Sequence, residues 1–118
     1  PTGYEYAGSC VQGKRHGQGK SSYPNGSTYE GMFENGQRHG YGVLKEKTGY
    51  SYLGNWKNGR RDGKGVENYE SGSTYTGHLK NGKRSGHGTM KYSNGEVAIG
   101  NWLNGRLSDA KKRLIPKD

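Results

Sequence analysis

The chain is short of the residues that build a conventional hydrophobic core. Leu, Ile, Val and Phe together account for 13 of its 118 residues, and the formal net charge is +9. This combination is typical of disordered chains, because too little apolar surface can be buried to offset the entropy of the backbone. Ten tyrosines and two tryptophans supply apolar area of another kind. We therefore expect a thin structure that is held together by aromatic rings.

Cysteine and long hydrophobic runs are also scarce. Cys10 is the only cysteine, which argues against a disulfide scaffold and fits a reducing cytosol. No apolar run reaches the length of a membrane-spanning helix or a signal peptide. The chain begins at Pro1 without a methionine, so we expect a piece of a longer, cytoplasmic protein.

Glycine, in contrast, is abundant and periodic. All 23 glycines fall into five series with a spacing of 23 residues, of which one is Gly3, Gly26, Gly49, Gly72 and Gly95. A fixed period of about 20–50 residues indicates an array of units that pack on their neighbours.

The period also predicts the domain organisation. We expect a repeat array over residues 1–107 and a basic tail over residues 108–118. The units of the array are expected near residues 4–26, 27–49, 50–72 and 73–95, with a half unit at residues 96–107.

Each unit is predicted to form two short strands and a tight turn. Asn-Gly pairs, such as those at residues 35–36 and 58–59, favour the two-residue turns of β-hairpins. From Thr28 to Glu34 aromatic or glycine positions alternate with polar ones, which predicts one aromatic and one polar face. The second strand of that unit is expected from about Gly40 to Glu46. The predicted fold class is all-β: an elongated single-layer array of antiparallel β-hairpins with about nine strands.

Aromatic side chains recur at equivalent positions of the array. Their first role is packing, in which a ring on one strand covers a glycine on its neighbour. Because a single sheet has no second layer, part of this aromatic strip should stay accessible and bind a partner. The predicted strip residues are Tyr29, Phe33, Tyr52, Trp56, Tyr75 and Trp102.

Most of the positive charge follows the Asn-Gly turns. These segments are expected at one edge of the sheet, about 10 Å apart, where they would form a basic rim. The predicted rim residues are Arg15, Arg38, Arg60, Arg61, Lys83, Arg84 and Arg106. Such a rim either only keeps the sheet soluble or attracts an acidic protein segment or anionic lipid headgroups. Nucleic acid is a less favoured partner, because the rings are committed to packing on the sheet.

No arrangement of residues predicts catalysis, a cofactor or a metal site. His16 and His39 occupy equivalent positions in adjacent units, about 10 Å apart, which is too far to share one metal ion. The Gly-x-Gly pairs precede neither a helix nor a Lys-Ser/Thr pair, so they are strand glycines and not phosphate-binding loops. A nucleophile, a base and an orienting carboxylate cannot be assembled at a convincing spacing.

The repeat resembles a known family. Residues 29–36 and 52–59 follow the pattern Tyr-x-Gly-x-aromatic-x-Asn-Gly, with Lys/Arg-x-x-Gly-x-Gly after it in most copies. In this pattern the chain is similar to the MORN (membrane occupation and recognition nexus) repeat family, over roughly residues 1–105. The departures from the pattern are Cys10 and Leu79 at the aromatic position, Gln12 at the turn asparagine and Ala98 at the tyrosine.

The resemblance implies an elongated hairpin array without catalytic activity. Modules of this family tether proteins to one another, to cytoskeletal or ciliary assemblies or to membranes, in some cases beside a catalytic domain. Partner peptides lie along the repeats in some members, and phosphoinositide binding has been proposed for others.

Three hypotheses of function remain open. In the first, the chain is a scaffold that binds an extended or helical protein segment along the strip and the rim and tethers it to a cytoskeletal or membrane-associated assembly. In the second, it binds phosphoinositides at the inner face of a membrane. In the third, it regulates or dimerises a catalytic domain elsewhere in a longer protein.

The tail also has two readings. It is expected either to cover the last strand edge, with a short helix starting at Ser108 or Asp109, or to form a basic linker.

Overall fold

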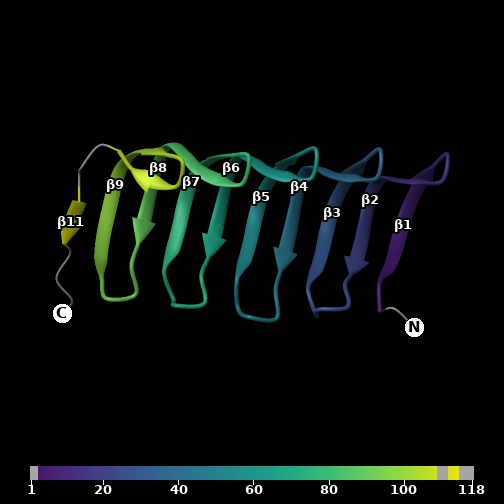
Figure 1. The fold of residues 1–118 in the computed structure, drawn as a ribbon, viewed down its shortest axis with the longest axis horizontal. Helices are drawn as coiled ribbons and strands as arrows, with labels where there is room; N and C mark the ends of the chain where they lie inside the picture. Colours follow the sequence, from purple (N-terminus) through teal and green to yellow (C-terminus); the bar gives the residue numbers. More distant parts are fainter. Residues whose placement is uncertain (1–2, 109–111, 115–118) are drawn as a thin grey trace.

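Figure 1 shows a computed structural model of the chain, which describes residues 3–108 and 112–114. Its regular structure consists of β-strands that all belong to one antiparallel sheet. Strands that follow one another from β1 to β10 lie side by side, so the sheet is a row of hairpins measuring 51 × 25 × 20 Å. The predicted all-β class and single-layer array are confirmed.

The sheet has nine long strands and two short ones, so the prediction of about nine strands missed only the short pair near the C-terminus. The strands are β1 (Glu5–Val11), β2 (Lys14–Ser22), β3 (Thr28–Glu34), β4 (Gln37–Lys45), β5 (Ser51–Lys57), β6 (Arg60–Asn68), β7 (Thr74–Lys80), β8 (Lys83–Lys91), β9 (Glu96–Leu103), β10 (Arg106–Leu107) and β11 (Lys112–Leu114).

Two-residue turns close the hairpins, and their backbone geometry explains the Asn-Gly pairs. Asn35 has a φ of 50° and Gly36 a φ of 81°, a region that asparagine and glycine adopt at low cost. The same geometry recurs at the other three Asn-Gly turns, and Gln12 takes the place of asparagine in the first hairpin with a φ of 50°.

A bulge bends each of the first four hairpins near its turn. In the β3–β4 hairpin, Phe33 pairs with Arg38, and residues 39–41 of β4 then oppose Met32 alone. Gly40, in the middle of the bulge, has a φ of 82°. Bulges bend the strand that carries the extra residues. The turn ends of the hairpins, at the top in Figure 1, therefore curl out of the plane of the strands.

The second strand of each unit begins earlier than the sequence predicted. β4 starts at Gln37 and not near Gly40, because the two-residue turn leads directly into the pairing of Glu34 with Gln37. Arg38 therefore belongs to a strand, and its side chain lies on one defined face of the sheet.

Side chains alternate between two faces, as predicted. In β3, Tyr29 and Phe33 are 0 % and 3 % exposed, whereas Glu30 and Met32 point to solvent. We call the face that carries Tyr29 the ring face and the opposite one the outer face.

Tyrosine rings lie directly over glycines of the ring face. A Cβ atom added to Gly42 or Gly65 would overlap the ring of Tyr29 or Tyr52. The Tyr29 hydroxyl donates a hydrogen bond to the Met32 carbonyl at 2.8 Å, which holds the far end of the ring. The absence of a side chain at these glycines therefore provides the space in which the sheet buries its rings.

Neighbouring hairpins are also tied together at their turns. The Gly36 N–H donates to the Arg15 carbonyl at 2.8 Å, and this bond recurs in each following turn. His16 and His39 each accept a longer bond, of 3.5 and 3.4 Å, from the backbone N–H of the next turn. The two histidines therefore act in the contact between units.

The two short strands lie along the last edge of the sheet. β10 and β11 both pair with β9, and β11 pairs with residues 96–98 of it. Of the helix expected from Ser108 or Asp109, residues 109–111 lie outside the described residues, and residues 112–114 are a strand. Strand pairing therefore covers this edge, where a helix was expected.

The overlap of rings and glycines generates a stability prediction. Gly42→Ala should lower the free energy of unfolding by about 3 kcal/mol, because its methyl group would displace the Tyr29 ring. Urea unfolding of the two proteins measures the loss. In a Tyr29→Ala background the same change should cost about 1 kcal/mol or less. An equal cost in both backgrounds would show that the ring is not the cause.

Candidate functional site

The predicted strip residues form the core of the molecule. Tyr29, Tyr52 and Tyr75 are 0 % exposed, and Phe33, Trp56 and Trp102 are at most 5 % exposed. The expectation of an accessible aromatic strip is therefore wrong for these rings. The cover comes from the curled turn ends and from arginine side chains, which the sequence analysis placed in loops.

The buried rings form a regular edge-to-face column. Tyr29 contacts Trp56 at a centroid distance of 5.4 Å and an interplanar angle of 89°, and Tyr52 contacts Trp56 in the same way at 5.2 Å. The indole N–H of Trp56 donates to the Gly42 carbonyl at 3.2 Å. Edge-to-face pairs of this kind add to the stabilisation from burial. Leu79 interrupts the series of rings, because it occupies the aromatic position between Trp56 and Trp102.

The predicted basic rim divides into two separate groups. Four of its arginines lie half-buried on the ring face, each at the second position of β2, β4, β6 or β8. We call them the inner arginines. They are Arg15, Arg38, Arg61 and Arg84. The remaining rim residues, Arg60, Lys83 and Arg106, precede this position by one residue and are exposed. The single rim is thus a wrong prediction, because strand alternation sends neighbouring residues to opposite faces.

Three of the inner arginines lie over core rings, and Arg61 lies over Tyr50. The guanidinium carbons of Arg38 and Arg84 lie 5.0 Å and 5.2 Å from the ring centroids of Trp56 and Trp102, and that of Arg15 lies 5.1 Å from Phe33. This distance allows a cation–π attraction. Arg15, Arg61 and Arg84 also donate to the carbonyl of the glycine in the next turn.

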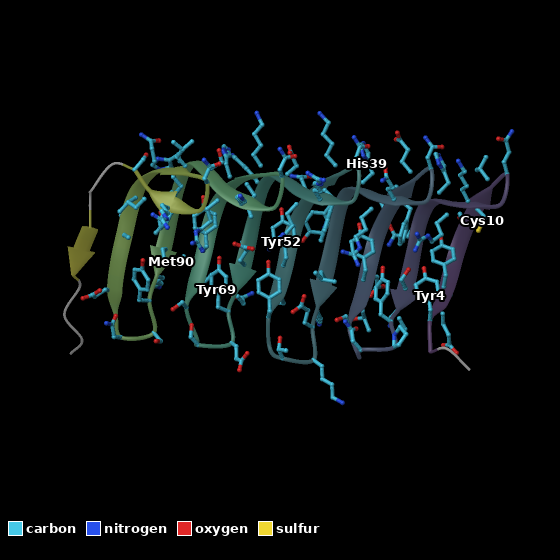
Figure 2. All side chains as sticks on the ribbon, viewed as in Figure 1. Tyr4, Cys10, His39, Tyr52, Tyr69 and Met90 are labelled. Carbon is cyan, nitrogen blue, oxygen red and sulfur yellow. The ribbon has the colours of Figure 1, made fainter. Side chains whose placement is uncertain are left out.

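A second row of tyrosines lies nearer the loops that join one hairpin to the next. Tyr4 and Tyr69 belong to this row, and Figure 2 shows them further from the turn end than Tyr52. Tyr4 and Tyr23 form one ring pair at 5.3 Å, and Tyr50 and Tyr69 form another at 5.8 Å.

The inner arginines alternate in the tyrosine that they bind. Arg15 and Arg61 donate to the hydroxyl of the tyrosine eleven residues before them, Tyr4 and Tyr50. Arg38 and Arg84 donate to the tyrosine fifteen residues before them, Tyr23 and Tyr69. The cause lies in the sequence, because serine replaces the nearer tyrosine in every second unit, at positions 27 and 73.

One carboxylate is buried on the ring face. Glu67 is 3 % exposed, and it accepts hydrogen bonds from the hydroxyls of Tyr50 and Tyr69 and from Arg61, the last at 2.5 Å. Burial, followed by these bonds to Glu67, raises the pKa of both tyrosines. Glu67 was not predicted from the sequence. The pattern that could have identified it is a carboxylate at a position where the other units have Ser21, Leu44 and Met90.

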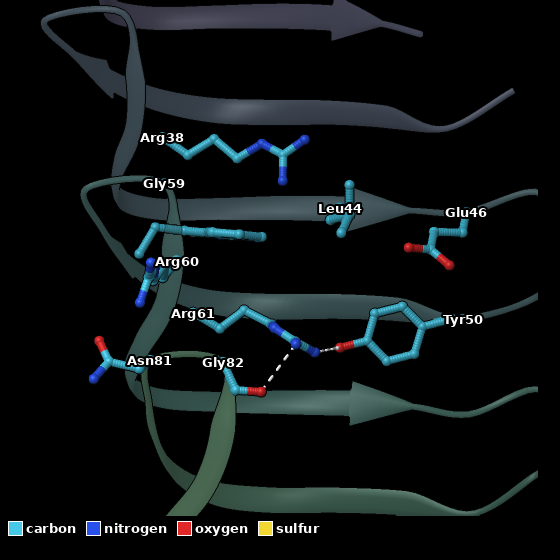
Figure 3. Close-up of a pocket in the computed structure, with 10 residues that line it drawn as sticks. Arg38, Leu44, Glu46, Tyr50, Gly59, Arg60, Arg61, Asn81 and Gly82 are labelled. Atoms are coloured by element: carbon cyan, nitrogen blue, oxygen red, sulfur yellow. Dashed lines mark hydrogen bonds between the residues drawn. The ribbon is translucent and has the colours of Figure 1, made fainter. Parts of the chain in front are cut away.

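The ring face is hollowed beside Arg38. Two adjoining hollows of about 360 and 370 Å³ share Arg38, Leu44 and Glu46, and we call them together the central hollow. Figure 3 shows Leu44 between Arg38 and Glu46, with Tyr50 beside them and Arg61 reaching toward its hydroxyl. Trp56, Arg60, Tyr23 and Ser27 are among the other lining residues.

The exposed cations gather on the C-terminal half of the turn edge. Lys57 pairs with Arg60 and Lys80 with Lys83 across their turns, whereas the corresponding pair of the β3–β4 hairpin is Glu34 and Gln37. A hollow of about 520 Å³ lies among three of these cations, without a carboxylate in its lining. We call this group the edge cations: Lys57, Arg60, Lys80, Lys83 and Arg106.

The described part of the chain has neither a candidate metal site nor a candidate membrane-spanning helix. Residues 3–108 and 112–114 contain no cluster of three or more His, Cys, Asp and Glu side chains that could hold a metal ion. Over the same residues there is no helix with the length and apolar character needed to cross a membrane.

The buried tyrosines generate a pH prediction. Burial raises the pKa of Tyr29 to about 12, against about 10 in an unfolded chain. The native state therefore binds more protons between these values, so its stability should be complete below about pH 10 and should fall as the pH rises toward 12. Urea unfolding at about pH 9 and pH 11 measures the fall. Tyr29→Phe should lose less stability over this interval, and an equal loss would contradict the assignment.

The comparisons with known proteins agree with this architecture. The family model of the MORN repeat matches residues 6–28, 29–45, 52–74 and 75–97. The comparison with curated proteins gives no significant match. Repeats of this family are in general non-catalytic modules associated with protein or membrane interaction. With four matched repeats along most of its sheet, the chain belongs to the MORN repeat family.

Proposed function

We propose that the chain is a scaffold that binds an acidic segment of a partner protein on its ring face and tethers it to a cytoskeletal or membrane-associated assembly. The observation that supports this most directly is the row of inner arginines. Their guanidinium groups lie half-buried over rings and remain partly accessible. Charges in such positions are less screened by water than fully exposed ones, and guanidinium groups bind carboxylates through charge-assisted hydrogen bonds.

The spacing of the inner arginines suits a regular acidic segment. Successive inner arginines are two strands apart, which is about 10 Å. Carboxylates three residues apart in an extended polyproline II segment, or seven residues apart in a helix, lie on one side of the segment with nearly the same spacing. A partner with acidic residues at either interval would meet one guanidinium group per unit.

The inner arginines differ in the charge that they offer. Arg61 is compensated by its ion pair with Glu67 at 2.5 Å. Among the described residues, Arg15, Arg38 and Arg84 have no carboxylate within ion-pair distance. Arg38 donates a hydrogen bond to Tyr23 only, although a guanidinium group carries five N–H donors. Arg38 therefore has the greatest capacity to bind a carboxylate.

The rings predicted to bind a partner have a supporting role in this proposal. Tyr29, Tyr52 and Tyr75 are covered and form the bed on which the arginines rest. The contact surface consists of the inner arginines, the second row of tyrosines and the central hollow. Trp56 contributes where it lines that hollow.

A charge-matched pair of variants tests the proposal with a capped polyglutamate peptide as the probe. Arg38→Gln/Arg84→Gln should weaken binding about a hundredfold, because each arginine contributes one charge-assisted contact of about 1.5 kcal/mol or more. Lys80→Gln/Lys83→Gln removes the same charge from the turn edge, at two residues that are not in the lining of the central hollow, and should change binding much less. Titration calorimetry gives the affinities, and circular dichroism checks that both variants fold. Equal weakening by the two pairs would place the acidic segment elsewhere.

The edge cations support a second candidate function, contact with an anionic membrane. They are exposed at the turn edge, and a hollow among Arg60, Lys80 and Lys83 has no carboxylate in its lining. Cations near an anionic lipid surface contribute about 1 kcal/mol each at low ionic strength. This surface could bind lipid while the ring face holds a protein segment.

Flotation with vesicles of phosphatidylcholine and phosphatidylinositol bisphosphate tests the membrane candidate. The chain should float with these vesicles at low salt and remain unbound with phosphatidylcholine alone. Arg60→Gln/Lys83→Gln/Arg106→Gln should abolish flotation, because about 3 kcal/mol of attraction is lost. Arg38→Gln/Arg84→Gln is the control and should still float. Failure of the unmodified chain to float at low salt would rule the candidate out.

A further inference from the structure

The central hollow coincides with an irregularity in the repeat. Two positions per unit supply the second row of tyrosines, and three of the four full units have a tyrosine at one or both of these positions. The exception is the second unit, which has Ser27 and Glu46 there. In the first and third units, the equivalent positions are occupied by the ring pairs Tyr4–Tyr23 and Tyr50–Tyr69.

Where these rings are missing, Leu44 forms the apolar part of the floor of the hollow. Leu44 is 8 % exposed and lines both parts of the central hollow. Tyr23 borders the hollow on one side and Tyr50 on the other. At the equivalent place in the third unit, Glu67 lies beneath the tyrosine pair and is 3 % exposed. The hollow thus lies where other units have tyrosine rings, and its apolar floor and bordering rings suit an aromatic side chain.

Opposite charges on the two sides of the hollow would orient a partner bound in it. The Arg38 guanidinium borders both parts of the hollow and retains unused donors. The Glu46 carboxylate lies on the other side of Leu44, as Figure 3 shows, and its hydrogen bond from Thr48 is long, at 3.5 Å. A partner carboxylate is therefore attracted toward Arg38 and repelled from Glu46. A tyrosine hydroxyl can donate to Glu46, as Tyr50 and Tyr69 do to Glu67.

We infer that the central hollow is the anchor site for the acidic partner and that it takes an aromatic side chain adjacent to a carboxylate. This inference rests on the proposed function and specifies the partner's chemistry. The ring fills the place of the missing tyrosine over Leu44, and the neighbouring carboxylate binds Arg38. A lysine or arginine side chain is a poorer occupant, because the hollow is bordered by Arg38, Arg60 and Arg61. Buried aromatic anchors of this kind dominate the binding energy of many interfaces.

Two short capped peptides of glutamate and alanine test the inference, one with a central tyrosine and one with a central alanine. The tyrosine peptide should bind the chain about tenfold more tightly, because one anchoring ring contributes more than about 1 kcal/mol. The Leu44 methyl signals in NMR spectra should shift with the tyrosine peptide and much less with the alanine peptide.

The variant Glu46→Tyr restores the tyrosine that the repeat has at this position in other units, so it is expected to fold. It should reduce the preference for the tyrosine peptide to about twofold or less, while the alanine peptide binds at least as well as before. Glu46→Ala is the matched control, since it removes the same carboxylate and leaves the hollow open. The control should keep most of the preference.

Each alternative result has a definite meaning. Equal binding of both peptides to the unmodified chain overturns the anchor site and leaves the proposed function intact. Binding of neither peptide overturns both. A preference that survives Glu46→Tyr, or that Glu46→Ala abolishes as completely, shows that the ring does not occupy this hollow.

Discussion

The packing of tyrosine rings on glycine backbone is the constraint on which the rest of this structure depends. A single-layer sheet has no second layer to cover its apolar side, so it must bury that side against its own chain. Tyr29 and its equivalents lie flat over glycines of the neighbouring strand, where any side chain would collide with the ring. The bulge at Gly40 then bends the turn end toward the rings, and Arg38 covers what remains. A unit alone cannot complete this arrangement, because each one uses parts of its neighbours.

Features that depend on a few adjacent residues could be predicted from the sequence. The Asn-Gly turns and the alternation in β3 were predicted because turn geometry and strand periodicity depend on a few adjacent residues. The position of Arg38 was not predicted, because the two-residue turn leads directly into strand pairing three residues before the expected strand start. The burial of Trp56 was missed for a different reason: its cover comes from Tyr29 and Arg38 of neighbouring strands and from Tyr52. Contacts between units are set by three-dimensional packing, and no local pattern reveals them.

The corrected placement of the basic residues changes the functional argument. A single rim would have made protein binding and lipid binding compete for the same charges. In the structure, strand alternation separates the half-buried inner arginines from the exposed edge cations, and Arg60 is the edge cation that also lines the central hollow. Glu67 further distinguishes the units by neutralising Arg61 alone. The basic residues of the chain therefore form two surfaces, which differ in geometry and in the ligands that would suit them.

The alternation of hydrogen-bond partners along the inner arginines has a consequence for alignment. In a perfectly uniform array, a bound segment could slip by one unit and find the same surroundings, so the complex would be a mixture of staggered forms. Here a shift of one unit exchanges an arginine that binds the tyrosine eleven residues before it for one that binds the tyrosine fifteen residues before it. The same shift moves the segment away from the unit that has Ser27 and Glu46. The departures from regularity therefore distinguish one unit from the next, and a segment bound as proposed would have one preferred alignment.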